Sequence, residues 1–105
     1  MFMRILGNVL DMSLDTVRAE ISRVDTEILR LITERQKLAG KIAQIKIAKG
    51  LPVHDQERTE KVLESVFGQA VESRIDPVAV QKIFEILIAM SEDRQRECSG
   101  DGNLP

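Results

Sequence analysis

The sequence contains no tryptophan, no tyrosine and only three phenylalanines. The strands of a β-sandwich draw on aromatic and β-branched residues, so this scarcity argues against that architecture. Hydrophobic residues nevertheless make up 43% of the 105 residues, which is enough for a core of aliphatic side chains. We therefore expect a single domain of packed helices.

Cysteine and histidine each occur once, as Cys98 and His54. A single cysteine can form neither an internal disulfide nor a cysteine metal cluster, and a single histidine leaves a zinc site short of ligands. The sequence therefore predicts no bound metal. We expect His54 to be an exposed loop residue and Cys98 to lie in the C-terminal tail.

An excess of positive charge is also lacking, because 15 basic residues face 17 acidic ones and the formal net charge is −2. This balance gives no general attraction to nucleic acid or to an anionic membrane, so anion binding would need a local cluster. The apolar opening MFMRILGNVL is too short to span a bilayer, and Asp11 follows it without a small-residue cleavage site. We expect a cytoplasmic protein, with residues 1–12 as an extension and Met12 as a candidate initiator.

Apolar residues recur at alternating intervals of three and four, which predicts one unbroken helix from about residue 14 to about residue 49. Ser13 is a suitable N-cap, and Gly50 and Pro52 end the pattern. At 1.5 Å per residue this helix would be roughly 54 Å long. Its apolar seam consists of Leu14, Val17, Ile21, Val24, Ile28, Leu31, Leu38, Ile42 and Ile45.

Asp55 and the pair Asp76–Pro77 mark the starts of two shorter helices, since aspartate is a good N-cap and proline suits the first helical position. We expect an all-α, three-helix protomer over residues 13–97 and a flexible tail over residues 98–105. The positions expected to face inward are Val62, Leu63, Val66 and Ala70 in the second helix and Val80, Ile83, Phe84, Leu87 and Ile88 in the third.

The two shorter helices can cover the apolar seam of the first helix only in part. A bare apolar seam favours a partner, and the simplest partner is a second copy related by a two-fold axis. We therefore expect an intertwined helical homodimer.

Polar residues interrupt the apolar faces at a few positions. Arg35 continues the seam of the first helix, and Lys46 lies 11 residues later, on the same face within about 20° and roughly 16 Å along the axis. Two cations so spaced could close on a small dianion. Ser91 and Gln95 continue the stripe of the third helix. Taken singly, Arg35 can be a register device, Lys46 a solvated helix-end lysine, and Ser91 and Gln95 the point where a helix leaves the core.

The order of these features resembles the AroQ-type, all-helical chorismate mutases. Residues 14–97 carry the resemblance, in the stretches VRAEISRVDTEILRLITERQKLAGKIAQIK, GLPVHDQERTEKVLE and KIFEILIAMSEDRQ. It implies an interlocked homodimer with shared active sites. It also implies a cofactor-free rearrangement of chorismate to prephenate in phenylalanine and tyrosine biosynthesis.

The resemblance also implies roles for single residues. Arg35 would hold one substrate carboxylate and Arg18 of the other protomer a second one, with Arg58 and Ser91 as further contacts on the carboxylate side. On its own chain, Arg18 lies roughly 25 Å from Arg35 and about 100° around the helix, so it cannot join that site.

Lys46 and Gln95 match the two residues that hydrogen-bond the ether oxygen of chorismate, and Asp55 matches a loop residue that helps to hold the ring hydroxyl. One position departs from the family. Where a glutamate usually follows the match of Arg58, this chain has Thr59, and Glu60 points about 100° away from it. The residue that contacts the hydroxyl is therefore either Thr59 or Glu60.

The sequence leaves two other functions open. An isochorismate-pyruvate lyase shares the fold and the cationic site, but resembles a version with a shorter loop than the stretch from Lys46 to Asp55, which favours the mutase. A non-catalytic helical dimer is the second alternative. In that case Arg35 sets the register, and Ser91 and Gln95 are surface residues.

Overall fold

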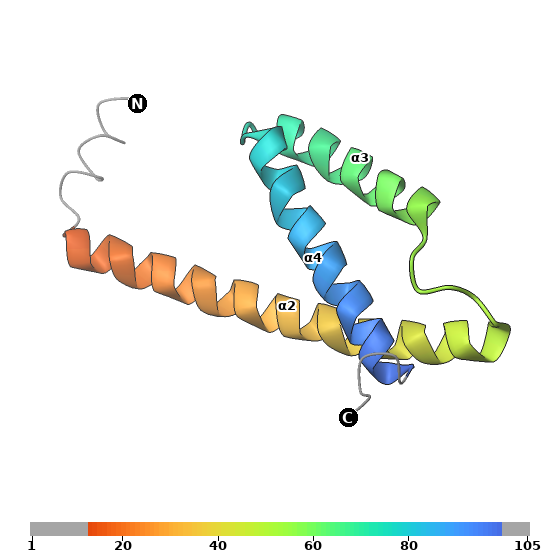
Figure 1. Ribbon diagram of the computed structural model, residues 1–105. Coiled ribbons are helices and arrows are strands. Elements are labelled where there is room, and N and C mark those ends of the chain that lie inside the picture. Colours follow the sequence, from red (N-terminus) through yellow and green to blue (C-terminus); the bar gives the residue numbers. More distant parts are fainter. Residues whose placement is uncertain (1–12, 100–105) are drawn as a thin grey trace. The chain divides into compact units, whose positions relative to one another are not determined.

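The computed structural model describes residues 13–99, which form three helices and no strand (Figure 1). The helices are α2 (Leu14–Lys49), α3 (Gln56–Glu72) and α4 (Pro77–Cys98). This confirms the expected all-α class and the three helices. The extension over residues 1–12 and the tail from residue 100 lie outside the described residues. Helix α4 includes Cys98, which the sequence assigned to the tail.

Local capping explains where each helix begins. The Ser13 hydroxyl accepts a hydrogen bond from the backbone N–H of Thr16 at 3.0 Å. Asp55 caps α3 by accepting from the N–H of Arg58 at 3.1 Å, and Asp76 caps α4 ahead of Pro77. Each cap satisfies a backbone donor that the first helical turn leaves without a partner.

Helices α2 and α3 end in the same kind of turn. After α2, Gly50 adopts a φ of 67°, and the N–H groups of Gly50 and Leu51 return to the carbonyls of Ile47 and Lys46. After α3, the N–H of Ile75 returns to the carbonyl of Ala70 at 3.1 Å, with Arg74 in the left-handed position at a φ of 58°. Both turns are Schellman motifs, but only the first has the glycine that this conformation favours.

The chain divides into two compact units, and residues 34–99 belong to the second. Within it, α3 packs along α4, and the second half of α4 lies beside the second half of α2 (Figure 1). A methyl group placed on Gly40 would lie 3.6 Å from the Cys98 sulfur, so the two helices approach closely there. Small and branched aliphatic side chains fill the buried core: Ala39, Ala43, Val66 and Ala70.

Most of the α2 seam is open in the single protomer. Its large aliphatic side chains are 42–63% exposed, namely Leu14, Ile21, Val24, Ile28, Leu31, Leu38, Ile42 and Ile45. Ile83 in α4 is 55% exposed in the single protomer, so it does not belong to the core that this protomer forms by itself. Within the described residues, no helix combines the length and the hydropathy that a membrane crossing requires.

The two Schellman turns predict opposite effects of substitution. Replacing Arg74 by glycine should raise the free energy of unfolding by about 0.5–1 kcal/mol, since a left-handed φ strains any side chain. Gly50→Ala should lower it by about 1 kcal/mol, because the space around Gly50 is open and only the backbone conformation is strained. Denaturant unfolding at one protein concentration measures both. Equal signs for the two variants would contradict this account of the turns.

Candidate active site

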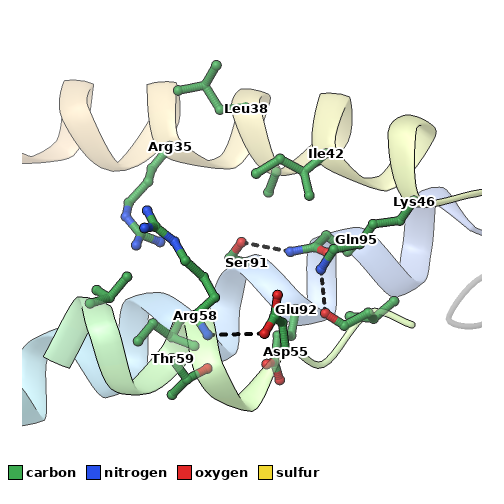
Figure 2. Close-up of a pocket in the computed structure, with 14 residues that line it drawn as sticks. Arg35, Leu38, Ile42, Lys46, Asp55, Arg58, Thr59, Ser91, Glu92 and Gln95 are labelled. Carbon is green, nitrogen blue, oxygen red and sulfur yellow. Dashed lines mark hydrogen bonds between the residues drawn. The ribbon is translucent and has the colours of Figure 1, made fainter. Parts of the chain in front are cut away.

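One pocket of about 340 Å³ lies within residues 34–99, between the second half of α2, the loop that follows it, α3 and α4 (Figure 2). Its wall contains the aliphatic side chains of Leu38, Ile42, Val62 and Ile88. The remaining lining is mostly polar and includes three cations. An apolar wall with a few polar groups is typical of a small-molecule site.

Two arginines meet on one side of the pocket. Arg35 projects from α2, and its guanidinium donates to the carbonyl of Leu87 at 3.2 Å. Burial, and then the positive charge of Arg58 on α3, lower the pKa of Arg35 below its ordinary value. Within the described part of the chain, no carboxylate pairs with either side chain. A carboxylate of a ligand would relieve this repulsion and fit the guanidinium geometry.

A chain of hydrogen bonds joins α2, the loop and α4 on the other side. The Lys46 ammonium donates to the Val53 carbonyl at 2.5 Å and to the Gln95 side-chain oxygen at 2.8 Å. The Gln95 amide nitrogen donates to the Ser91 hydroxyl at 3.1 Å, as drawn in Figure 2. Lys46 and Gln95 each keep one further N–H, so both can donate to a bound molecule.

The burial of Gln95 distinguishes a residue of the pocket from a surface residue, the two alternatives that the sequence left open for it. Its side chain is only 5% exposed, and it is the one buried polar residue among residues 13–99. A surface position, as the non-catalytic alternative requires, is therefore wrong for Gln95, and Ser91 is half-buried beside it. Buried amides need hydrogen-bond partners, and Lys46 and Ser91 supply them.

The first turn of α3 brings Asp55, Arg58 and Thr59 to the pocket. Asp55 is both the N-cap and a lining residue, so its carboxylate is held at the pocket edge. Thr59 lines the pocket, whereas Glu60 does not and accepts a hydrogen bond from the Gln56 side chain at 3.0 Å. Of the two alternatives for the hydroxyl contact, the structure thus brings Thr59 to the site.

Arg18 is the exception among the site residues that the sequence predicts. It belongs to the first unit of the chain, is exposed, and does not line the pocket. The other seven residues singled out in the sequence all do: Arg35, Lys46, Asp55, Arg58, Thr59, Ser91 and Gln95.

The sequence reasoning missed Glu92, which also lines the pocket. One carboxylate oxygen lies 2.7 Å from His54 Nδ1, and the other lies 3.6 Å from Arg96. The available signal was its spacing, four residues after Ile88 and three before Gln95 on one helix face. Because it follows Ser91 near the end of the apolar stripe, it reads as an exposed acid.

The chemistry open to this pocket is positioning and electrostatic stabilisation. Arginines can orient carboxylates, and the Lys46 and Gln95 donors can meet an oxygen that gains negative charge during a reaction. Between Ser13 and Ser99, no three histidine, cysteine, aspartate or glutamate side chains cluster in a way that would hold a metal ion.

Comparison with known proteins agrees with this geometry. The family model described as chorismate mutase type II matches residues 17–96. The chorismate mutase of Methanocaldococcus jannaschii is 35% identical over 81 residues, which cover 77% of this chain and 82% of that protein. The bifunctional chorismate mutase/prephenate dehydratase of Aquifex aeolicus is 47% identical over 53 residues, which cover 50% of this chain and 15% of that protein.

A solved structure shows the same fold. A conserved hypothetical protein from Pyrococcus furiosus superimposes with a TM-score of 0.63 at 32% sequence identity, covering 79% of this chain and 95% of that one. The matched residues 17–96 include all three helices for most of their length and every residue of the pocket. The chain therefore belongs to the type II chorismate mutase family.

Proposed function

We propose that the protein converts chorismate to prephenate in this pocket, as an isomerase of aromatic amino acid biosynthesis. The observation that carries the proposal is the pair of donors, Lys46 and Gln95, held side by side opposite two arginines in a pocket of a type II chorismate mutase fold. The reaction breaks a C–O bond as a C–C bond forms within one molecule. No proton is transferred, so the pocket needs neither a base nor a nucleophile.

The arginines suit the first task of the site, which is to hold the substrate in a folded conformation. Arg35 and Arg58 can pair with one carboxylate, and the aliphatic wall formed by Leu38, Ile42 and Ile88 shapes the space for the ring. The Ser91 hydroxyl, which accepts from Gln95, is a further polar group of the pocket. Fixing both reacting ends in one pose removes much of the entropic cost of the rearrangement.

Lys46 and Gln95 suit the second task, which is to stabilise the ether oxygen as it gains negative charge. Each has a donor left after its contacts within the protein. Asp55 and Thr59 lie at the edge of the pocket, where they can accept from the ring hydroxyl.

We further propose that the active form is a homodimer located in the cytoplasm. The exposed aliphatic seam of α2 is a large apolar surface, and burying it against a second copy would remove it from water. The second copy would also supply Arg18 to the pocket as the partner of the other substrate carboxylate.

A lysine pair tests the proposed activity. Lys46→Ala should lower kcat for chorismate by about 100- to 1,000-fold, since one donor to the developing charge is lost. Lys49→Ala is the matched control, because Lys49 is an exposed lysine in the same last turn and does not line the pocket. Loss of chorismate and appearance of prephenate are followed with purified protein. A wild type that leaves chorismate unchanged would exclude the proposed reaction.

Substitution of Gln95 should create a pH dependence in kcat. In Gln95→Glu the side chain donates only when protonated, and when ionised it opposes the growing negative charge. The variant should therefore lose activity near neutral pH and recover part of it in acid. Gln69→Glu is a close control, since Gln69 donates to Ser65 four residues earlier, as Gln95 does to Ser91, but outside the pocket. Full activity of Gln95→Glu at pH 8 would remove Gln95 from the mechanism.

Mixed dimers test the shared site. Arg18→Ala and Arg35→Ala chains should each be inactive alone, and activity should return after the two are refolded together. A mixed dimer places both substitutions in one site and leaves the other site intact. Light scattering should give twice the chain mass in every case. An active monomer, or mixed dimers without activity, would contradict the shared site.

A further inference from the structure

The loop between α2 and α3 carries the one histidine of the sequence at the edge of the pocket. The loop contributes Val53 and Asp55 to the lining, and the Val53 carbonyl accepts from Lys46. His54 lies between these two residues and contacts Glu92 on α4, which also lines the pocket. The His54–Glu92 pair therefore joins the loop to the helix that carries Gln95.

The partners of the His54 ring favour its protonated form. Nδ1 lies 2.7 Å from a carboxylate oxygen of Glu92, and Nε2 lies 3.0 Å from the side-chain oxygen of Gln56. The Gln56 amide nitrogen is engaged in turn, since it donates to the Glu60 carboxylate at 3.0 Å. Turning the Gln56 amide over would set its oxygen against that carboxylate. Both ring nitrogens thus face acceptors, and only the imidazolium form donates from both.

The charged groups around the ring also favour the protonated form of His54. On α4, Glu92 faces the ring and Arg96 lies behind Glu92 at 3.6 Å. On α3, Gln56 links the ring to Glu60; Asp55 is the next residue of the loop, and Lys46 of α2 binds the loop at Val53. The hydrogen bond to Glu92, followed by that to Gln56, raises the pKa of His54, against the opposing effects of its burial and of Arg96.

We propose that protonated His54 and Glu92 act as a positioning pair that sets substrate affinity, an inference that rests on the proposed conversion of chorismate. Protonated His54 holds the loop to α4 and neutralises a carboxylate that faces the pocket. When His54 loses its proton, the loop contact weakens and Glu92 presents a negative charge to a dianionic substrate. Both effects oppose binding, whereas the bound substrate itself holds Lys46 and Gln95 in place for the reaction.

The direction of the pH effect follows from the raised pKa. The pair is complete below the ordinary histidine value of about 6.5 and is lost as the pH rises through the higher value in the folded protein. The KM for chorismate should therefore increase over this interval by about two- to five-fold, the effect of one solvent-exposed ion pair, while kcat stays level.

The single histidine permits a direct measurement with the full chain. Proton NMR of its one imidazole should give a titration midpoint above about 6.5, and Glu92→Gln should lower that midpoint. Glu64→Gln is the matched control, because Glu64 is an exposed acid on α3 outside the pocket, and it should leave the midpoint unchanged. A midpoint that is the same in the wild type and in Glu92→Gln would overturn the pair.

Steady-state kinetics at constant ionic strength complete the test. In the wild type, the rise in KM should share the NMR midpoint, and His54→Asn should show a KM that does not vary over the same pH range. A pH dependence of KM that persists in His54→Asn would overturn the positioning role. A protein that does not consume chorismate, but in which the His54 midpoint still depends on Glu92, would exclude the proposed reaction and support the pair.

Discussion

The Lys46 ammonium lies between the Val53 carbonyl and the Gln95 side chain, and this contact holds the end of α2, the following loop and α4 together. The backbone of the same residue takes part in the Schellman turn, because the Lys46 carbonyl accepts from the N–H of Leu51 at 2.8 Å. One residue therefore takes part in the turn after α2, fixes the path of the loop and orients a buried amide. Displacing it would leave Gln95 with an unsatisfied oxygen inside the protein, which is costly.

The pocket is cationic because its arginines have no carboxylate partner among the described residues, whereas its acids are paired with other groups. Arg35 and Arg58 repel one another, with no carboxylate paired to either among residues 13–99, so the arrangement is most stable with an anion present. The two acids of the lining are engaged elsewhere. Asp55 caps α3, and Glu92 contacts His54 and Arg96. The cationic side of the pocket is thereby organised before a substrate enters. Charges that are already in place need no reorganisation during the reaction, and this preorganisation is the main source of electrostatic catalysis.

Two residues of the pocket lining, Thr59 and Glu92, are not what the family resemblance led us to expect. Thr59 occupies a pocket position at which the sequence resemblance leads one to expect glutamate. The second acid of the lining is Glu92 on α4, and one of its carboxylate oxygens lies 2.7 Å from the His54 ring.

The sequence by itself determined where the three helices begin and end. Ser13, Gly50, Asp55 and Asp76 act through hydrogen bonds or backbone preferences within a few residues, so their effect can be read without a fold. Of the eight site residues that the family resemblance proposed, seven line the pocket. Only the tertiary structure decided that Gln95 is buried against Lys46, which lies 49 positions away in the sequence. It also decided that Thr59 rather than Glu60 reaches the pocket, and that Ile83 is exposed in the single protomer. Periodicity defines the faces of a helix, but contacts between distant segments decide which face is covered. The same contacts decide whether an acid such as Glu92 meets solvent or a histidine from a distant loop.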